Sequence, residues 1–207
     1  MSIDTIFSIV ILLMSAVIHE VSHGMAALYL GDPTAKYEGR LTLNPVRHID
    51  LFGSIILPVL LVLAHSGFVF AYAKPVPYNP DNLRNKRWGD AIVAGAGPLS
   101  NIILALFFGA LLRFGPALGL PLNEAFIGIC AGIVFINILL AVFNLVPIPP
   151  LDGSKIFFSL LPLRMRGVRF ELERYGFFLV LLFIIFIWQW LSPVISYLFE
   201  LVTGYPL

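Results

Sequence analysis

The segment His19-Glu20-Val21-Ser22-His23 contains the residue types of a hydrolytic metal site. His19 and His23 are four residues apart, so a helix places both imidazoles on the same face. Neutral imidazoles are common zinc ligands, and zinc lowers the pKa of a bound water to about 7. Glu20, beside the ligands, can accept a proton as that water attacks a carbonyl. The H-E-x-x-H spacing therefore predicts a zinc-dependent hydrolase with Glu20 as the general base.

These three ionisable residues interrupt an apolar stretch at about residues 5–30. Ionisable side chains inside a membrane span are costly and usually serve a function. A bound metal accounts for such a cluster, whereas a chance match to the pattern does not. We therefore favour a metal site over a structural role.

Two histidines leave a catalytic zinc site incomplete, because such a site needs a third protein ligand and an open position for water. The other candidate ligands are His48, Asp50, His65, Asp90 and Asp152. Asp152 is favoured because it follows an apolar stretch and a cluster of prolines. Proline cannot continue a helix, so we expect an extended backbone at membrane depth. Such a backbone would let a carboxylate and a peptide approach the same metal.

The composition is that of an integral membrane protein. Of the 207 residues, 59% are hydrophobic and 12% are charged, and the mean hydropathy is +0.93. Soluble domains carry about 25% charged residues, so a soluble enzyme and a disordered tail are excluded. A net charge of +1 gives no field that would attract nucleic acid. The single cysteine, Cys130, excludes an intramolecular disulfide and a cysteine-rich zinc site.

We expect a single domain over residues 1–207, an all-α polytopic protein embedded in the lipid bilayer. Five apolar stretches lie at about residues 5–30, 51–73, 91–112, 125–146 and 175–201. About 20 residues span a bilayer, so four of these stretches are expected to be full transmembrane helices. Glycine and proline interrupt 51–73, which is expected to be re-entrant or oblique. The polar link 34–50 predicts a short membrane-associated β-hairpin or an extended loop.

The charges of the links support this topology. If 51–73 enters and leaves on one side, twelve of the thirteen lysines and arginines share that side, and Arg113 lies opposite. The positive-inside rule places that side in the cytoplasm and both termini outside. His19, His23 and Asp152 then all lie toward the cytoplasm. Five plain spans are the alternative, and they would separate Asp152 from the histidines.

The motifs together resemble the site-2 protease family of intramembrane zinc metalloproteases. The resemblance rests on His19–His23 in a first span and Asn144–Gly153 after a later one, with further matches at Gly39–Pro45, Lys74–Pro80 and Gly95–Asn101. It covers nearly the whole chain and is closest to the compact bacterial and archaeal branch without a PDZ domain. The resemblance implies a cell-membrane protease that hydrolyses a peptide bond within or near a transmembrane segment of another protein.

The same resemblance implies a role for each site residue. One Zn²⁺ per chain would be bound by three ligands: His19, His23 and Asp152. Glu20 would be the catalytic base, and Asn144 would hold the substrate backbone or stabilise the oxyanion. Tyr37–Asn44 would pair with an unwound substrate strand.

Two other functions could use the same residues. A membrane metal transporter or sensor could bind its ion at the His/Asp cluster, but transport has no need of Glu20 beside the ligands. A catalytically inactive scaffold is disfavoured because the proposed ligands and base are all present. Among nearby residues, Asn101 is expected to bond to the Asn144–Asp152 loop. Gly95 and Gly97 are expected to serve helix packing more than substrate contact.

Overall fold

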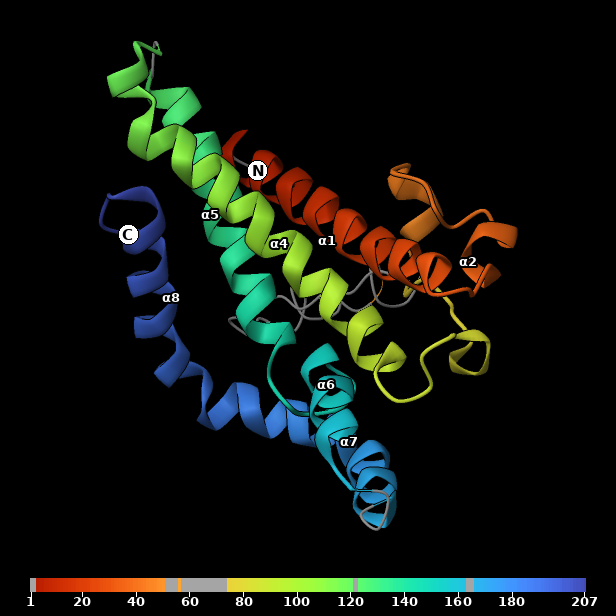
Figure 1. Cartoon of the computed structure of the whole chain (residues 1–207). Coiled ribbons are helices and arrows are strands. Elements are labelled where there is room, and N and C mark those ends of the chain that lie inside the picture. The colour runs from red at the N-terminus through yellow and green to blue at the C-terminus, as the bar shows by residue number, and fades with distance from the viewer. Residues whose placement is uncertain (1–2, 51–55, 57–73, 121–122, 163–165) are drawn as a thin grey trace.

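The computed structural model of the chain describes residues 3–50, 56, 74–120, 123–162 and 166–207. Three long helices form its centre: α1 (Ile3–Tyr29), α4 (Gly89–Phe114) and α5 (Glu124–Asn144). They pack against one another, and Figure 1 shows them side by side. Each is long and apolar enough to cross a membrane, in α1 over Phe7–Tyr29. The prediction of an all-helical polytopic membrane protein is confirmed for the described residues, which contain no strand.

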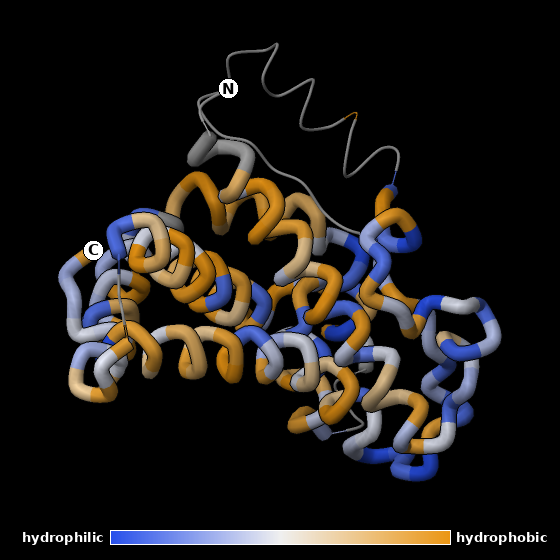
Figure 2. Tube along the Cα trace, turned by 90° about the horizontal axis from the view of Figure 1, so that it is seen from above, coloured by the Kyte–Doolittle hydropathy of each residue, from blue (hydrophilic) through white to orange (hydrophobic). Residues whose placement is uncertain are grey.

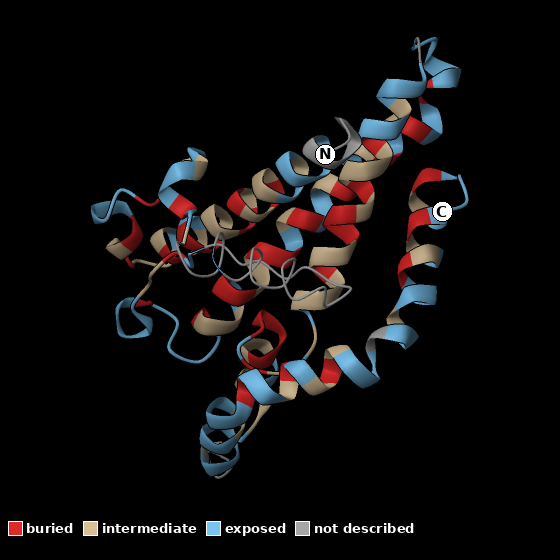
Figure 3. Ribbon diagram, turned by 180° about the vertical axis from the view of Figure 1, so that it is seen from behind, coloured by how far each residue is buried: buried red, intermediate tan, exposed pale blue. Residues whose placement is uncertain are grey.

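Apolar and polar residues separate as a bilayer requires. Figure 2 shows hydrophobic residues along the helices and hydrophilic residues gathered in connecting loops. Figure 3 shows buried residues where α1, α4 and α5 face one another. On the outward face of α4, Leu99, Ile103 and Leu106 are each more than half exposed. Because exposing apolar surface to water costs free energy, these side chains suit contact with lipid.

The stretch 175–201, expected to be a full transmembrane helix, is not one unbroken helix. The chain forms α7 (Arg166–Phe186) and α8 (Trp188–Thr203), which meet at Ile187 with a bend of 74°. The described residues therefore contain three candidate spans, or four if the bent pair counts as one.

Packing favours this bend, because it lets α8 lie against the central helices α4 and α5. The buried residues of that contact are Ala105, Val134, Ile138, Ile195 and Phe199.

The prediction of a β-hairpin in residues 34–50 is wrong. This link forms the short helix α2 (Thr34–Tyr37) and the 3-10 helix η1 (Pro45–His48), with no strand between them. Side chains bind the carbonyls that a hairpin would pair. His48 Nε2 donates to the Thr42 carbonyl at 2.8 Å, and Arg40 donates to the carbonyl of Arg47. Tyr37–Asn44 therefore has no strand to offer a substrate.

Shorter elements complete the described chain. The 3-10 helices η3 (Pro80–Asn82) and η4 (Pro116–Leu118) precede and follow α4. The helix α6 (Asp152–Leu160) follows α5 and packs on α4. The predicted re-entrant segment 51–73 lies outside the described residues, apart from Ile56.

Asp32 fastens the end of α1 to the segment before α4. It is fully buried, and its carboxylate accepts hydrogen bonds from the Thr34 hydroxyl (2.6 Å), the Asn79 backbone N–H (2.7 Å) and the Asn82 amide (2.8 Å). Burial alone would raise the pKa of Asp32, but these bonds to the ionised form hold it below its ordinary value. Gly31, at φ +106°, supplies the left-handed residue that ends α1 before this junction.

We expect Asp32→Asn to destabilise the protein at neutral pH by about 2 kcal/mol, since hydrogen bonds to a charged group are lost. Because folding lowers the pKa of Asp32, its stabilisation is complete above the ordinary carboxyl pKa, about 4, and is lost as the pH falls through the lower folded pKa. Thermal unfolding in detergent across this pH range measures the difference. The two melting temperatures should converge in acid, and a constant gap would contradict this role.

Candidate metal centre

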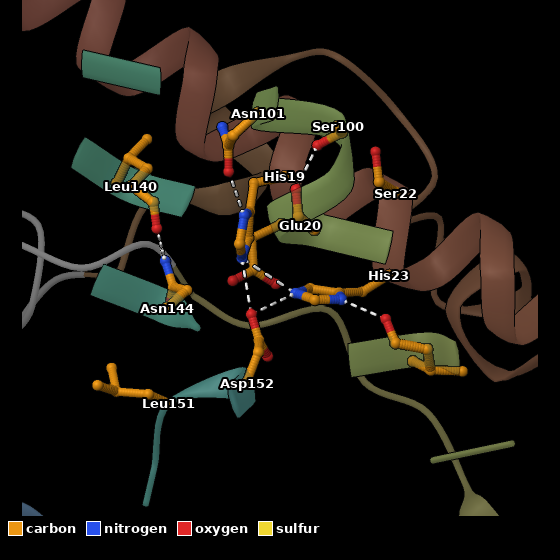
Figure 4. A network of polar contacts seen from close by, with 12 residues as sticks. His19, Glu20, Ser22, His23, Ser100, Asn101, Leu140, Asn144, Leu151 and Asp152 are labelled. Carbon is orange, nitrogen blue, oxygen red and sulfur yellow. Dashed lines mark hydrogen bonds and ion pairs between the residues drawn. The ribbon is translucent and has the colours of Figure 1, made fainter. Parts of the chain in front are cut away.

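His19 and His23 lie one turn apart on α1, and both are buried. Asp152, the first residue of α6, faces them across the site (Figure 4). The two Nε2 atoms are 3.0 Å apart, and Asp152 Oδ2 lies 3.1 Å from His19 Nε2 and 3.2 Å from His23 Nε2. The structure thus brings the motif histidines together with a carboxylate that is 133 residues from His19 in the sequence.

The second nitrogen of each imidazole faces an oxygen acceptor. His23 Nδ1 lies 2.7 Å from the backbone carbonyl oxygen of Val93, and His19 Nδ1 lies 2.6 Å from Asn101 Oδ1. A carbonyl oxygen accepts and cannot donate, so each Nδ1 carries a proton. Each neutral imidazole is then left with a bare lone pair on Nε2.

Three lone-pair donors therefore converge on one point, where they would repel one another without a cation. Zinc–ligand bonds of about 2.0–2.1 Å in a tetrahedron set neighbouring donor atoms about 3.3 Å apart. The distances here are 3.0–3.2 Å. The donor types, their spacing and their burial fit a first-row divalent metal, and zinc is commonly bound by this set.

Asp152 reaches the site because α5 stops and the chain turns back. The segment 145–151 is a series of turns, not the extended backbone predicted above. One turn is closed by the Leu151 N–H, which donates to the Ile148 carbonyl at 2.9 Å. Next to apolar helices the backbone must satisfy its own polar groups, and turns do this better than an unpaired extended chain.

Close packing then fixes the start of α6. A Cβ on Gly153 would lie 2.2 Å from the Leu145 carbonyl oxygen, so a side chain at this position would push α6 away from the end of α5. The carboxylate of Asp152 faces the two Nε2 atoms through Oδ2, and an ionised carboxylate is the form that binds metals.

Glu20 is next to the imidazoles, as Figure 4 shows. Its Oε2 accepts a hydrogen bond from the backbone N–H of Val76 at 2.8 Å. The segment before Val76 is itself held by Arg40, which donates to the carbonyls of Lys74 (2.8 Å) and Pro75 (3.2 Å). Glu20 is thus fixed beside the three atoms that could bind a metal: the Nε2 atoms of His19 and His23 and the Asp152 carboxylate oxygen.

At Gly97, α4 passes directly against both imidazoles. A Cβ at this position would lie 2.5 Å from His23 Nε2 and 2.6 Å from His19 Cε1. A Cβ on Gly95 of the same helix would meet its nearest neighbour, Ile156, at an ordinary 3.9 Å. The sequence suggested a packing role for both glycines, but the structure places Gly97 at the site itself.

Asn101 does not bond to the Asn144–Asp152 loop, as was expected from the sequence. It is fully buried, faces His19 through Oδ1, and donates through Nδ2 to Asn137 Oδ1 at 2.8 Å. Sequence reasoning missed Asn137. The signal that could have found it is an amide side chain in the interior of an apolar span, where polar groups are rare.

The remaining predicted residues make other contacts. Asn144 donates to the Leu140 carbonyl at 3.0 Å, one turn earlier in α5 (Figure 4). Of the rejected third-ligand candidates, His48 bonds to its own loop, and Asp90 accepts from the Tyr78 hydroxyl. His65 lies outside the described residues.

Comparison with known proteins identifies the family. Residues 120–187 match the sequence profile described as Peptidase family M50. A Bacillus subtilis (strain 168) protein named "Putative zinc metalloprotease YwhC" is 36% identical over 198 residues, which cover 92% of this chain and 83% of that protein. The chain belongs to peptidase family M50, the site-2 protease family. This M50 chain is therefore a metalloprotease, and its apolar helices make it a multi-pass membrane protein.

Two further relatives of the M50 chain are named "Putative zinc metalloprotease Rip2". The Mycolicibacterium smegmatis protein is 35% identical over 142 residues, which cover 68% of this chain and 52% of that protein. The Mycobacterium tuberculosis (strain H37Rv) protein is 30% identical over 194 residues, which cover 91% of this chain and 71% of that protein. No solved structure matches the chain significantly. The predictions of the family and of a metalloprotease are confirmed.

We expect Gly97→Ala to weaken zinc binding by about tenfold or more, because the added methyl group displaces both imidazoles. Gly95→Ala is the matched control, since it adds the same methyl group to the same helix where there is room. Competition with a chromophoric chelator in detergent measures both affinities. Equal affinities in the two variants would show that α4 does not confine the imidazoles.

Proposed function

We propose that this M50 chain is an intramembrane zinc endopeptidase. It hydrolyses a peptide bond within or near a transmembrane segment of another membrane protein. One observation carries the proposal: two bare imidazole nitrogens and a carboxylate oxygen converge within 3.2 Å, buried among apolar helices. A metal transporter or sensor could use the same cluster, but the base beside the ligands and the metalloprotease relatives favour hydrolysis.

Each residue of the site has one proposed role. His19, His23 and Asp152 hold one zinc ion per chain, and a bound zinc supplies a Lewis acid and a water of lowered pKa. Glu20 takes the proton of the attacking water and returns it to the leaving amine. Its Oε2 is anchored by Val76, while Oε1 has no hydrogen bond with the described residues and is available for this proton.

Asn144 is the proposed donor to the substrate backbone or to the oxyanion. It is half-buried at the end of α5, directly before the turns that carry Asp152. Its amide is engaged with Leu140 on its own helix, so a side-chain rotation exchanges this bond for one with substrate. Because the lost bond and the gained bond are both amide–carbonyl bonds, the exchange costs little net free energy.

We further propose that residues 1–207 act as one domain in the cell membrane, with the site toward the cytoplasm and both termini outside. Basic residues support this orientation. Arg84, Lys86 and Arg87 precede α4 at the end that carries the site, and Lys155 lies in α6. Arg113 lies at the other end of α4. This charge asymmetry matches the positive-inside rule.

We expect Glu20→Gln to retain zinc and to lose cleavage by about a hundredfold or more, the usual contribution of a general base. Glutamine can still accept the Val76 N–H, so the local fold should hold. Reconstitution with solubilised host membrane proteins, followed by mass spectrometry of new N-termini, measures cleavage. Glu171→Gln, at an exposed position of α7, is the control and should cleave like wild type. Undiminished cleavage by Glu20→Gln would exclude Glu20 as the base.

Metal content tests the ligands independently of any substrate. Purified wild-type protein should contain about one zinc per chain, Asp152→Ala should lose it, and Glu20→Gln should keep it. Inductively coupled plasma mass spectrometry gives the stoichiometry. A wild-type protein that stays metal-free after zinc is added back would overturn the proposed protease.

A further inference from the structure

A line of hydrogen bonds crosses three helices and ends on His19. Asn101 Oδ1 of α4 faces His19 Nδ1 at 2.6 Å, and Asn101 Nδ2 donates to Asn137 Oδ1 of α5 at 2.8 Å. Asn137 Nδ2 donates to Ser15 Oγ of α1 at 2.9 Å and to the Ile133 carbonyl of α5 at 2.8 Å. Both asparagines are fully buried. Figure 4 shows the end of this line, where Asn101 points at His19.

The Ile133 carbonyl determines the direction of the amide bonds in this line. A backbone carbonyl oxygen accepts and cannot donate, so the Asn137 atom that faces it must be the amide nitrogen. Asn137 Oδ1 then faces Asn101 and must be met by the Asn101 nitrogen. Asn101 Oδ1 is left to face His19, so His19 Nδ1 must carry the proton and Nε2 must be bare.

The reverse orientation is unfavourable at each amide. Turning Asn137 would set its carbonyl oxygen against that of Ile133 in a low-dielectric interior, where unpaired polar groups are costly. Turning Asn101 would present an N–H to His19 Nδ1 and move the imidazole proton to Nε2. Nε2 faces His23 and Asp152, and a protonated nitrogen cannot bind a metal there.

We propose that Asn137 is a positioning residue that fixes the metal-binding tautomer of His19 through Asn101. This inference rests on the proposed zinc site. His23 needs no such line, because its Nδ1 donates directly to the Val93 carbonyl. In both histidines a backbone carbonyl thus determines which ring nitrogen carries the proton. Val93 does so directly for His23, and Ile133 does so for His19 through two amides.

A purely structural role makes a different prediction. Buried asparagines can hold membrane helices together, with about 1 kcal/mol per hydrogen bond. That role would lower the stability of the protein and leave its zinc affinity unchanged. Zinc affinity therefore separates a positioning residue from a structural one.

The test measures zinc affinity of the full chain in detergent by chelator competition. Asn101→Leu should weaken binding by about 10–100-fold, the usual effect of removing the partner of a ligating histidine. Asn137→Leu should weaken it by about tenfold. The double variant should bind no more weakly than Asn101→Leu, because Asn137 acts through Asn101. Wild-type affinity in Asn137→Leu, or additive losses in the double variant, would overturn the proposal.

Two matched controls sharpen the result. Ser15→Ala removes one partner of Asn137 but leaves the Ile133 carbonyl in place, so zinc affinity should stay within about twofold of wild type. Thr203→Val removes a buried hydrogen bond in α8, to the Phe199 carbonyl, that has no connection to His19. It should lower stability without changing zinc affinity.

A measurement on metal-free wild-type protein covers the case in which Asn137→Leu does not fold. Nitrogen-15 NMR of labelled histidine at about pH 8.5, where imidazole is ordinarily neutral, reports which ring nitrogen is protonated. A His19→Gln sample assigns the His19 signal. The Nδ1–H form supports the proposal and the Nε2–H form overturns it. If wild type binds no zinc, the proposed protease fails; if it binds zinc and only the Asn137 results fail, the protease stands.

Discussion

Two imidazole nitrogens and a carboxylate oxygen are held within 3.2 Å of one another with their lone pairs directed inward, and the rest of the structure follows from this constraint. These groups repel in the absence of a cation, and the low dielectric around them strengthens that repulsion. The surroundings must therefore be rigid. The Val93 carbonyl orients one ring and Asn101 orients the other. Glycines at 97 and 153 let α4 and α6 approach closely enough to confine them.

The membrane setting explains how the other polar groups near the site are arranged. Water is scarce at this depth, so each polar group needs a partner within the protein. The turns of 145–151 bond to one another, and Asn101 and Asn137 bond to each other and to neighbouring helices. Arg40 does the same for the loop beside Glu20 by donating to several carbonyls. The position of Glu20 therefore depends on the same requirement, because the Arg40 bonds hold the chain that carries the Val76 N–H.

The convergence of His19, His23 and Asp152 can be predicted from the sequence better than the contacts around them. His19 and His23 lie one helical turn apart, and Asp152 reaches them because of the order and direction of the helices. Neither of these facts depends on the exact rotation of a helix. The bond between Asn101 and His19 depends on how α4 is rotated about its axis, and that rotation depends on the close approach at Gly97. The hairpin is absent, and the stretch 175–201 is bent, for a similar reason. Long-range contacts of Arg40, and of α8 with α4 and α5, override the local pattern there.

The line of hydrogen bonds from His19 to Ile133 has a consequence for proton transfer. Its last acceptor is a backbone carbonyl, and its two middle members are amides, which do not readily release protons. The line can therefore orient His19 but cannot serve as a proton wire into the helix bundle. In the proposed hydrolysis, protons would therefore have to be exchanged by a route other than this line, and Glu20 is the proposed group for that exchange. Orientation of His19 and transfer of protons would then be separate tasks, carried out by different residues of the proposed site.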